Sequence, residues 1–296
     1  MAQPQTIFVT GGRGRLASLI ADHFRAPAHA VRLFSRTAGP GFGRLADLQH
    51  PAGFTAAQAV LHLAWSTLPA TSELHPRTEW DHDLPFLEKM LAALSAAPAP
   101  VHFVFFSSGG TVYGNAGERP SVETDRCQPV GRHGRAKLAA EELIAAHVAR
   151  HGLACTILRI SNPYGYPVPQ SRVQGIVPHA LRCAVEGQPL NLWGDGQARK
   201  DFIYYTDFLS ALAEILARRL TGTFNLCAGE SHRVREVIEL VEQHTGRPVT
   251  LQCQPARAWD VQDSRLDHRR LVAATGWRPQ VSLAEGIRRA AAGYAG

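Results

Sequence analysis

The sequence has few of the features that mark secreted, membrane-spanning or nucleic-acid-binding proteins. Its five cysteines fall at irregular spacing without a CxxC pair, which argues against a disulfide framework and a zinc site. No apolar run approaches the ~20 residues that span a bilayer. The apolar strand that starts at Thr6 leaves no room for a signal peptide. We therefore expect a cytoplasmic protein that has no metal site and does not bind or span a membrane.

The composition is that of an ordinary globular protein with a basic excess. The 296 residues are 45% hydrophobic and 19% charged, which suits one large or two modest domains with ample core. The net charge of +6 favours small anionic ligands over nucleic acid, because no run of like charges and no basic–aromatic alternation accompanies it. Cys155 and Cys227 lie in apolar runs and are expected in the core.

Short apolar runs alternate with stretches of helical period, as in a parallel sheet. Strands are expected at residues 6–10, 29–34, 59–65, 101–108 and 154–160, and helices at 15–24, 84–97 and 136–152. Strands buried on both faces and separated by helices predict an α/β fold with a Rossmann-like, doubly wound parallel sheet. Residues 37–46 hold three Gly and one Pro, so we expect a loop there in place of a full helix.

The pattern changes after residue 160. We expect a loop at 161–175, a helix and a strand within 177–194, a strand end and a helix capped by Thr206 within 204–220, a strand at 224–229, and helices at 234–246 and 282–294. Residues 1–160, joined by 201–226, are expected to form a dinucleotide-binding Rossmann domain. Residues 161–200 and 227–296 are expected to form a smaller α/β domain that binds the substrate.

A glycine turn follows the first expected strand. Gly11, Gly14 and Ala17 recur at three-residue spacing. Gly11 allows the tight turn, Gly14 lets the backbone approach a pyrophosphate, and Ala17 keeps the helix close to the sheet. The helix starts at Arg15 and Leu16, and its N-terminus would hold the phosphates. This context predicts dinucleotide binding.

The end of the second expected strand bears on the choice of cofactor. A carboxylate there would accept a hydrogen bond from the ribose 2′-hydroxyl of NAD. The sequence "RLFSRT" offers Ser35 and Arg36 instead, and Arg13 lies in the glycine turn. Two arginines and a hydroxyl suit a 2′-phosphate. We expect NADP, with NAD as the alternative.

With these motifs, the chain resembles the extended short-chain dehydrogenase/reductase superfamily, and within it the NAD-dependent epimerase/dehydratase family typified by UDP-glucose 4-epimerases. The resemblance runs nearly end to end, through "TGGRGRLAS", "VLHLAW", "FFSSGGTVYG", "LRISNPYG", "LNLWGDGQARKDFIYYTDF", "FNLCAG" and "LDHRRLVAATGWRP". It implies a Rossmann domain for the cofactor and a C-terminal domain for a nucleoside-diphosphate sugar. A homodimer, which relatives commonly form, is compatible with it.

The resemblance also implies roles for individual residues. Leu63, Ala64, Ser107 and Lys137 match positions that bind the cofactor. The positions that match the sugar-nucleotide site are Asn162 and Lys200 for the diphosphate, Trp193 for the base-binding strand, and Arg257 for a second phosphate contact.

The catalytic positions depart from the family pattern. The catalytic Ser or Thr is replaced by Gly109, and the catalytic Tyr by His133, four residues before Lys137. Arg44 stands where the family has a cofactor-side Asp, and Asp83 where it has an Asn. The binding motifs survive, whereas the catalytic set survives only at the lysine.

Histidine suits the tyrosine's task, although its ring reaches less far. In this chemistry a hydride passes between nicotinamide and a sugar carbon, while a proton passes between the sugar hydroxyl and a side chain. The pKa of an imidazole is already near neutrality, so His133 could accept and return that proton. Ser108 and Thr111 are candidate substitutes for the missing serine.

Three functions fit these observations. The first is a nucleotide-sugar 4-epimerase, or a 4-ketoreductase or dehydratase, that uses His133 or water in place of tyrosine. The second is a catalytically silent protein that binds NADP and a nucleotide sugar. The third, a reductase of a non-sugar carbonyl, is opposed by Asn162, Trp193, Lys200 and Arg257. We favour 4-epimerisation.

Overall fold

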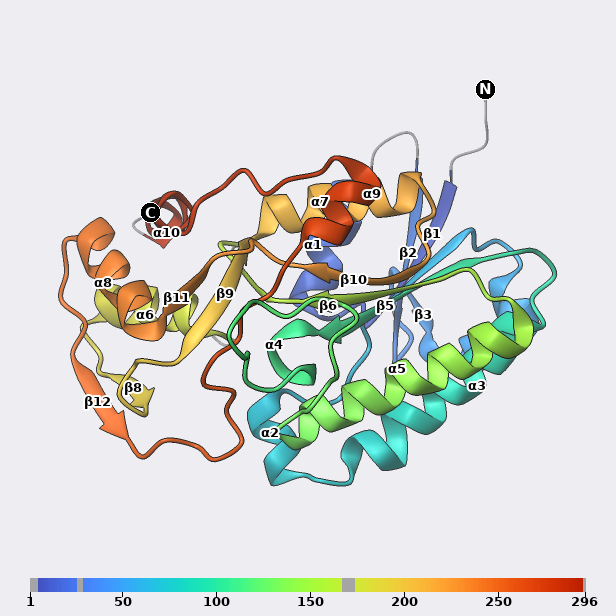
Figure 1. Cartoon of the computed structure of the whole chain (residues 1–296). Helices are drawn as coiled ribbons and strands as arrows, with labels where there is room; N and C mark the ends of the chain where they lie inside the picture. The colour runs from blue at the N-terminus through green and yellow to red at the C-terminus, as the bar shows by residue number, and fades with distance from the viewer. Residues whose placement is uncertain (1–4, 26–28, 167–173, 295–296) are drawn as a thin grey trace. The chain divides into compact units, whose positions relative to one another are not determined.

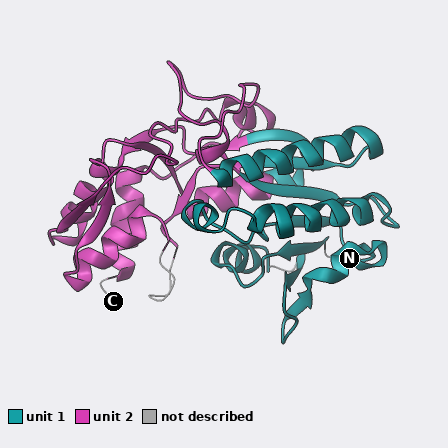
Figure 2. Cartoon of the chain, turned by 90° about the horizontal axis from the view of Figure 1, so that it is seen from below, with its two compact units in different colours: residues 1–107, 132–158, 215–224 teal, residues 108–131, 159–214, 225–296 magenta. Residues whose placement is uncertain are grey.

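The computed structural model describes residues 5–25, 29–166 and 174–294, and the chain divides into two compact units (Figure 2). Unit 1 consists of Met1–Ser107, Arg132–Leu158 and Ile215–Phe224. Unit 2 consists of Ser108–Gly131, Arg159–Glu214 and Asn225–Gly296.

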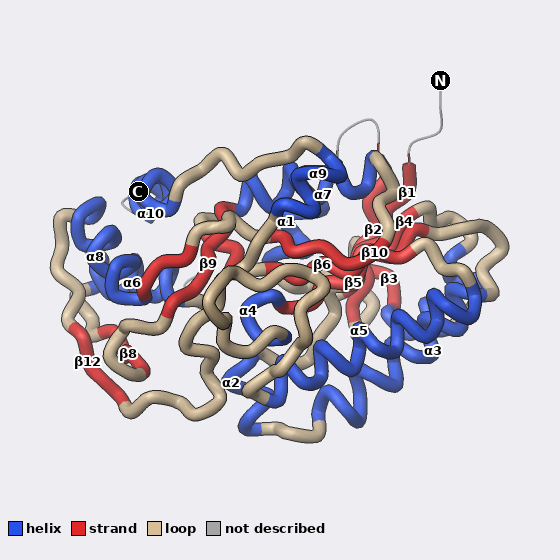
Figure 3. The backbone as a smooth tube through the Cα atoms, in the orientation of Figure 1, coloured by secondary structure: helices blue, strands red, loops and turns tan. Residues whose placement is uncertain are grey.

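A seven-stranded sheet with the order β10-β6-β5-β4-β1-β2-β3 forms the centre of the Rossmann-like fold (Figures 1 and 3). Its strands are β1 (Gln5–Thr10), β2 (His29–Ser35), β3 (Phe42–Arg44), β4 (Ala59–His62), β5 (His102–Ser108), β6 (Cys155–Ile160) and β10 (Gly222–Leu226). β1 pairs in parallel with β2 and β4, and β4 with β5. The predicted α/β class and the five N-terminal strands are confirmed.

The helices of unit 1 cover both faces of its sheet. They are α1 (Arg15–Phe24), α2 (Pro69–Leu74), α3 (Leu84–Ser95) and α5 (Arg132–His151), with the short turns η1 (Leu45–Gln49), η2 (Pro51–Phe54) and η3 (Glu79–Asp83). α3 and α5 pack against each other (Figure 3) and bury Met90 and Ile144 with Phe8 and Phe105 of the sheet. Ile7 points to the opposite face from Phe8, because side chains alternate along a strand.

The stretch after β2 differs from the expected loop. Residues 42–44 form β3, which pairs in parallel with the end of β2, and η1 and η2 follow it. The glycines that break the helical pattern allow this edge strand: a Cβ at Gly43 would lie 2.7 Å from the Phe34 ring. The absence of a full helix was predicted correctly, and the edge strand was missed.

Unit 2 is built from helices around two small sheets. Its sheets have the orders β11-β9-β7 and β12-β8. Its elements are α4 (Gly109–Val112), β7 (Asn162–Tyr164), α6 (Ile176–Glu186), β8 (Leu190–Trp193), β9 (Arg199–Tyr204), α7 (Tyr205–Ala217, which ends in unit 1), β11 (Ser231–Arg233), α8 (Val234–Thr245), β12 (Leu251–Gln254), α9 (Arg269–Thr275) and α10 (Leu283–Tyr294). Leu181, Leu192, Phe202, Val237 and Ile287 form its buried core.

Most C-terminal helices were predicted, but the strands β11 and β12 were missed and only the end of β9 was predicted. β7 lies inside the expected loop at 161–175, of which residues 167–173 lie outside the described part of the chain. α7 begins at Tyr205, so Thr206 lies in its first turn and is not its cap. α9 was missed, because a helix of seven residues is too short for a clear helical period.

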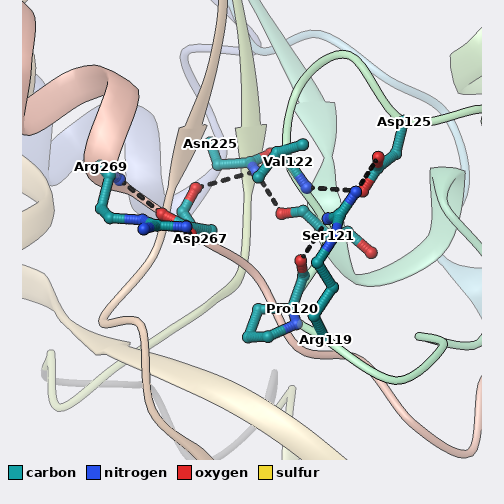
Figure 4. Close-up of polar contacts among 8 residues, drawn as sticks. All are labelled: Arg119, Pro120, Ser121, Val122, Asp125, Asn225, Asp267 and Arg269. Atoms are coloured by element: carbon teal, nitrogen blue, oxygen red, sulfur yellow. Dashed lines mark hydrogen bonds and ion pairs between the residues drawn. The ribbon is translucent and has the colours of Figure 1, made fainter.

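The side chain of Asn225 ties two loop segments of unit 2 to the end of β10 (Figure 4). Its Nδ2 donates to the carbonyls of Ser121 at 2.9 Å and Asp267 at 3.0 Å. Arg119 binds Asp125 through two nitrogens at 2.8 and 2.7 Å. The buried amide therefore fixes both loops through backbone acceptors, which depend little on the side chains around them.

Cys155 and Cys227 are buried, as expected, and burial raises the pKa of both thiols, to about 12 for Cys155. They are core residues and poor nucleophiles. No helix in the described ranges combines the length and apolar character that a bilayer span requires.

Gly109, the residue at the family's serine position, is enclosed by its neighbours in unit 2. A Cβ there would lie 2.6 Å from Leu266 Cδ1 and 2.9 Å from the Arg159 carbonyl oxygen. The adjacent Gly110 has room, because its Cβ would meet Ser264 Oγ only at 3.9 Å.

We predict that Gly109→Ser lowers the free energy of unfolding by about 1–3 kcal/mol, the cost of overpacking a core. Gly110→Ser is the matched control and should be nearly neutral. Urea denaturation of both variants tests this, and equal stability of Gly109→Ser and the native protein would contradict the packing argument.

A buried histidine links the strands β5 and β6 of unit 1 to the turn before β10. His102 Nε2 lies 2.8 Å from both Thr156 Oγ1 and the Leu220 carbonyl. Burial lowers its pKa to about 4. The unfolded chain therefore binds a proton at this site below pH ~6.5, whereas the folded chain binds it only near pH 4.

We predict that stability falls as the pH drops from about 6.5 to about 4, with a contribution from His102 of about 3 kcal/mol. His102→Gln should be less stable at neutral pH and should lose this part of the pH dependence. His50→Gln, at an exposed residue, is the control. If His102→Gln loses as much unfolding free energy between about pH 6.5 and about pH 4 as the native protein does, His102 is not the source of this pH dependence.

Candidate functional site

The glycine turn joins β1 to α1 in unit 1. Gly11 has a φ of +70°, and a Cβ there would lie 3.0 Å from the Ala64 nitrogen. Gly14 N donates to the Gly11 carbonyl at 2.7 Å, and α1 begins at the next residue, Arg15, followed by Leu16. No side chain caps this helix. A bare helix N-terminus behind a glycine turn attracts phosphate.

The segment after β4 is fixed beside this turn. Thr10 Oγ1, at the end of β1, accepts a hydrogen bond from Ala64 N at 3.0 Å and lies 2.9 Å from His62 Nδ1. Burial lowers the pKa of His62 to about 3, so its ring is neutral. Leu63 and Ala64 thus border the glycine turn, as a cofactor cleft in this sheet requires.

The residues expected to select the cofactor lie at the end of β2. Exposed Arg36 lines a cavity of about 430 Å³ with Ala64, Ser66 and Asp83. The Arg13 guanidinium lies 4.8 Å from the centre of the Phe42 ring.

Two neighbouring side chains contribute less to this selection. The Ser35 hydroxyl donates to the Thr37 carbonyl at 2.5 Å, so its proton is already used. Arg44 is exposed at the end of β3. Arg36 and Arg13 remain the expected contacts to a 2′-phosphate.

These features of unit 1 fit a dinucleotide. The turn at Gly11 leaves no room for a side chain, the helix behind it offers backbone N–H groups, and the cavity beside Arg36 is bordered by Ala64. A nicotinamide dinucleotide would be held by the turn at its pyrophosphate and by the end of β2 at its adenosine ribose.

Lys137 is buried on α5. Its Nζ donates to the Phe106 carbonyl at 2.9 Å and lies 3.8 Å from the centre of the Trp65 ring. Burial lowers its pKa to about 7, against the opposing charges of Asp83, Glu141 and Glu79. The amine is therefore fixed in place, and it gives up its proton more readily than an exposed lysine does.

His133 lies one helical turn before Lys137 and is 8% exposed. Its Nδ1 lies 3.7 Å from Oε1 of Glu79, which is fully buried. Burial lowers the pKa of His133 below 6.5, and the neighbouring carboxylate limits the decrease. The imidazole is therefore neutral at physiological pH and able to accept a proton.

The candidate hydroxyls at the end of β5 differ in their partners. Ser107 Oγ, in unit 1, donates to Glu141 Oε1 at 2.5 Å. Ser108 and Thr111 belong to unit 2. There Thr111 Oγ1 lies 3.5 Å from the Ser108 carbonyl, a weak contact that leaves the hydroxyl able to turn to another acceptor.

Within unit 2, two of the expected substrate residues bind backbone carbonyls. Asn162 Nδ2 donates to the Asp201 carbonyl at 2.7 Å. Lys200 Nζ donates to the Val261 carbonyl, and burial lowers its pKa against the opposing charges of Asp260 and Asp263.

The other two expected substrate residues contact each other. The Arg257 guanidinium lies 3.7 Å from the centre of the Trp193 ring. Trp193 is 43% exposed, so this cation–π pair presents an aromatic face and a cation together. Such a surface suits an aromatic base and a phosphate.

Sequence reasoning missed Glu79 and Trp65, which contact the two α5 residues. The only available signal was a matching spacing, since Glu79 and Asp83 are four residues apart, as are His133 and Lys137. In the described part of the chain, no group of three or more His, Cys, Asp or Glu side chains could hold a metal ion.

Comparisons with known proteins agree with this geometry. The family model of the NAD dependent epimerase/dehydratase family matches residues 7–227. The chain is 26% identical to UDP-glucose 4-epimerase of Corynebacterium glutamicum, over 93% of this chain and 91% of that protein. It is 30% identical to dTDP-4-dehydro-6-deoxyglucose reductase of Escherichia coli over 62% of this chain, a match that spans 58% of that relative's length.

Among solved structures, the UDP-glucose 4-epimerase of Thermus thermophilus in complex with NAD is similar, with a TM-score of 0.88 and 27% identity. The similarity covers 99% of both chains. The region that the family model matches includes the glycine turn, α5 and all of β10. The chain belongs to the NAD dependent epimerase/dehydratase family.

Proposed function

We propose that this protein is a nucleotide-sugar 4-epimerase that binds NADP and uses His133 as its proton carrier in place of tyrosine. Unit 1 binds the cofactor, and the residues Asn162, Trp193, Lys200 and Arg257 of unit 2 bind a nucleoside diphosphate. The UDP-glucose 4-epimerases among the relatives support this substrate class.

One observation carries the proposal. His133 and Lys137 are both buried on one face of α5, within reach of buried or partly buried carboxylates. Burying two ionisable bases costs free energy, and ligand binding alone would require only Lys137 of the pair. Perturbed ionisable groups gather at sites that move protons. The pair therefore supports catalysis over silent binding.

The chain's own residues would divide the work as follows. A bound nicotinamide supplies the group that takes up and returns a hydride. His133, neutral at physiological pH, accepts the proton of the sugar 4-hydroxyl as the 4-keto sugar forms, and returns it to the 4-keto oxygen when C4 is reduced from its opposite face. Lys137 holds the cofactor ribose. Thr111 or Ser108 polarises the substrate oxygen in place of the missing serine.

A 4-ketoreductase is the second candidate, and the 30% identity to a dTDP-4-dehydro-6-deoxyglucose reductase favours it. It requires only the return half of the same chemistry, in which protonated His133 gives its proton to a keto oxygen. A 4-epimerase forms product without net consumption of the cofactor, whereas a 4-ketoreductase oxidises one reduced cofactor for each product formed.

The cofactor preference is tested at Arg36. We predict that NADP binds more tightly than NAD, and that Arg36→Ala weakens NADP binding by about 1.5–3 kcal/mol, the value of a charge-assisted contact. NAD binding should be unchanged. Arg25→Ala, near the far end of α1, is the control. Calorimetry that finds NAD binding as tight as NADP binding would contradict the preference.

The catalytic role is tested at His133. We predict that His133→Ala lowers kcat for interconversion of UDP-sugars by about 100- to 10,000-fold, the range for loss of a positioned acid–base group. Cofactor binding should remain. His151→Ala, at the exposed end of α5, is the control.

Chromatography of UDP- and dTDP-sugars after incubation with either cofactor measures this activity. If the native protein is active and His133→Ala keeps its rate, the proton is carried by Thr111, Ser108 or water. A native protein inactive on all these sugars would favour the silent homologue.

A further inference from the structure

Glu79 is a fully buried carboxylate beside His133. Its Oε1 accepts a hydrogen bond from the Thr67 hydroxyl and lies 3.7 Å from His133 Nδ1. Glu79 Oε2 and His133 Nδ1 are buried and have no hydrogen-bond partner among the described residues. Unpaired polar atoms are expensive to bury, and a hydrogen on Nδ1, directed at the Glu79 carboxylate, would reduce this cost for His133.

The local backbone brings these groups together. Glu79–Asp83 form η3, a π-helical turn at the start of α3, and such turns are frequent at functional sites. Glu79 and Asp83 are four residues apart on η3, as are His133 and Lys137 on α5, so each pair shares one face of its element. The Asp83 carboxylate accepts from Ser66 N at 3.0 Å and Ser66 Oγ at 2.8 Å, which leaves Glu79 as the acceptor for the imidazole.

Glu79 remains ionised despite its burial. Burial raises the pKa of this carboxyl, but polar contacts with His133, Thr67 and Ser72 outweigh it and hold the pKa at about 2. The other charged groups that act on His133 are Lys137 on α5, which disfavours the imidazolium, and Asp83 on η3, which favours it. Beyond them, Glu73 of α2 is paired with Arg132 at 3.3 Å.

A carboxylate beside one ring nitrogen of a histidine decides where the ring carries its proton. The nitrogen that faces the carboxylate keeps its hydrogen, and the other nitrogen keeps its lone pair. The carboxylate also stabilises the imidazolium that forms when a second proton arrives.

We propose that Glu79 is the positioning residue for His133: it accepts a hydrogen bond from Nδ1–H and leaves Nε2 as the atom that exchanges protons with the substrate. This inference rests on the proposed function only for the identity of the proton donor. When the substrate hydroxyl gives its proton to Nε2, the O–H bond breaks, an N–H bond forms, and the new positive charge is paired with Glu79.

Nitrogen NMR of the full-length protein with isotopically labelled histidine tests the proposal without any substrate. The chain has 14 histidines, so His133→Gln identifies the signals of His133. We expect the Nδ1–H tautomer in the native protein. In Glu79→Gln the midpoint of the His133 titration should fall by about one pH unit or more, because a carboxylate at this distance favours the imidazolium by at least that much.

Glu73→Gln is the matched control, since that carboxylate is occupied by Arg132, and it should leave the midpoint nearly unchanged. In an active enzyme, the acid limb of the kcat profile should move down with the midpoint in Glu79→Gln while KM stays constant. Glu79→Asp keeps the negative charge, so the midpoint of its His133 titration should lie closer to the native value than that of Glu79→Gln.

An Nε2–H tautomer in the native protein, or an unchanged midpoint in a folded Glu79→Gln, would overturn the proposal. If Glu79→Gln does not fold, the native tautomer alone decides. A native protein with the expected tautomer but no turnover would refute the proposed function and leave the role of Glu79 in orienting His133 intact.

Discussion

The burial of two bases on α5 against the acids of η3 is the constraint on which the rest of the site depends. His133 and Lys137 would each lose solvation by entering the interior. Glu79 offsets this cost for the imidazole, and the Phe106 carbonyl and the Trp65 ring hold the amine. The outcome is an imidazole that is neutral at physiological pH and an amine whose pKa is lowered by burial, both fixed in orientation.

The proposed catalytic positions depart from the family pattern more than the proposed binding positions do. The turn at Gly11 keeps the geometry that a dinucleotide requires, and the pair of Trp193 and Arg257 presents the chemistry that a nucleotide requires. The serine position is different, because Leu266 closes on Gly109 and leaves no room for a side chain. A single reversion at Gly109 therefore cannot recreate the family's catalytic set, and a histidine with its own carboxylate is a self-consistent alternative.

Local patterns in the sequence were enough to predict the parallel sheet, the three long helices of unit 1 (α1, α3 and α5) and the glycine turn, because each depends on residues close in the chain. β3 was missed, since an edge strand of three residues has too little periodicity to detect. The contact between Glu79 and His133 joins residues more than fifty positions apart, and the space around Gly109 depends on Leu266. Such facts arise only when the chain is folded, so the motif indicated a missing tyrosine without indicating the partner of its replacement.

The central claim, that an imidazole moves the proton, is tested most directly by single-turnover kinetics. Enzyme loaded with the oxidised cofactor is mixed with UDP-glucose, and the rate of cofactor reduction is followed by absorbance across a range of pH. The account predicts a rate that rises as His133 loses its proton and reaches a plateau below pH ~6.5, the ordinary value of an imidazole. A rate that continues to rise toward the range of a phenol or an amine, or that does not change with pH, would contradict it.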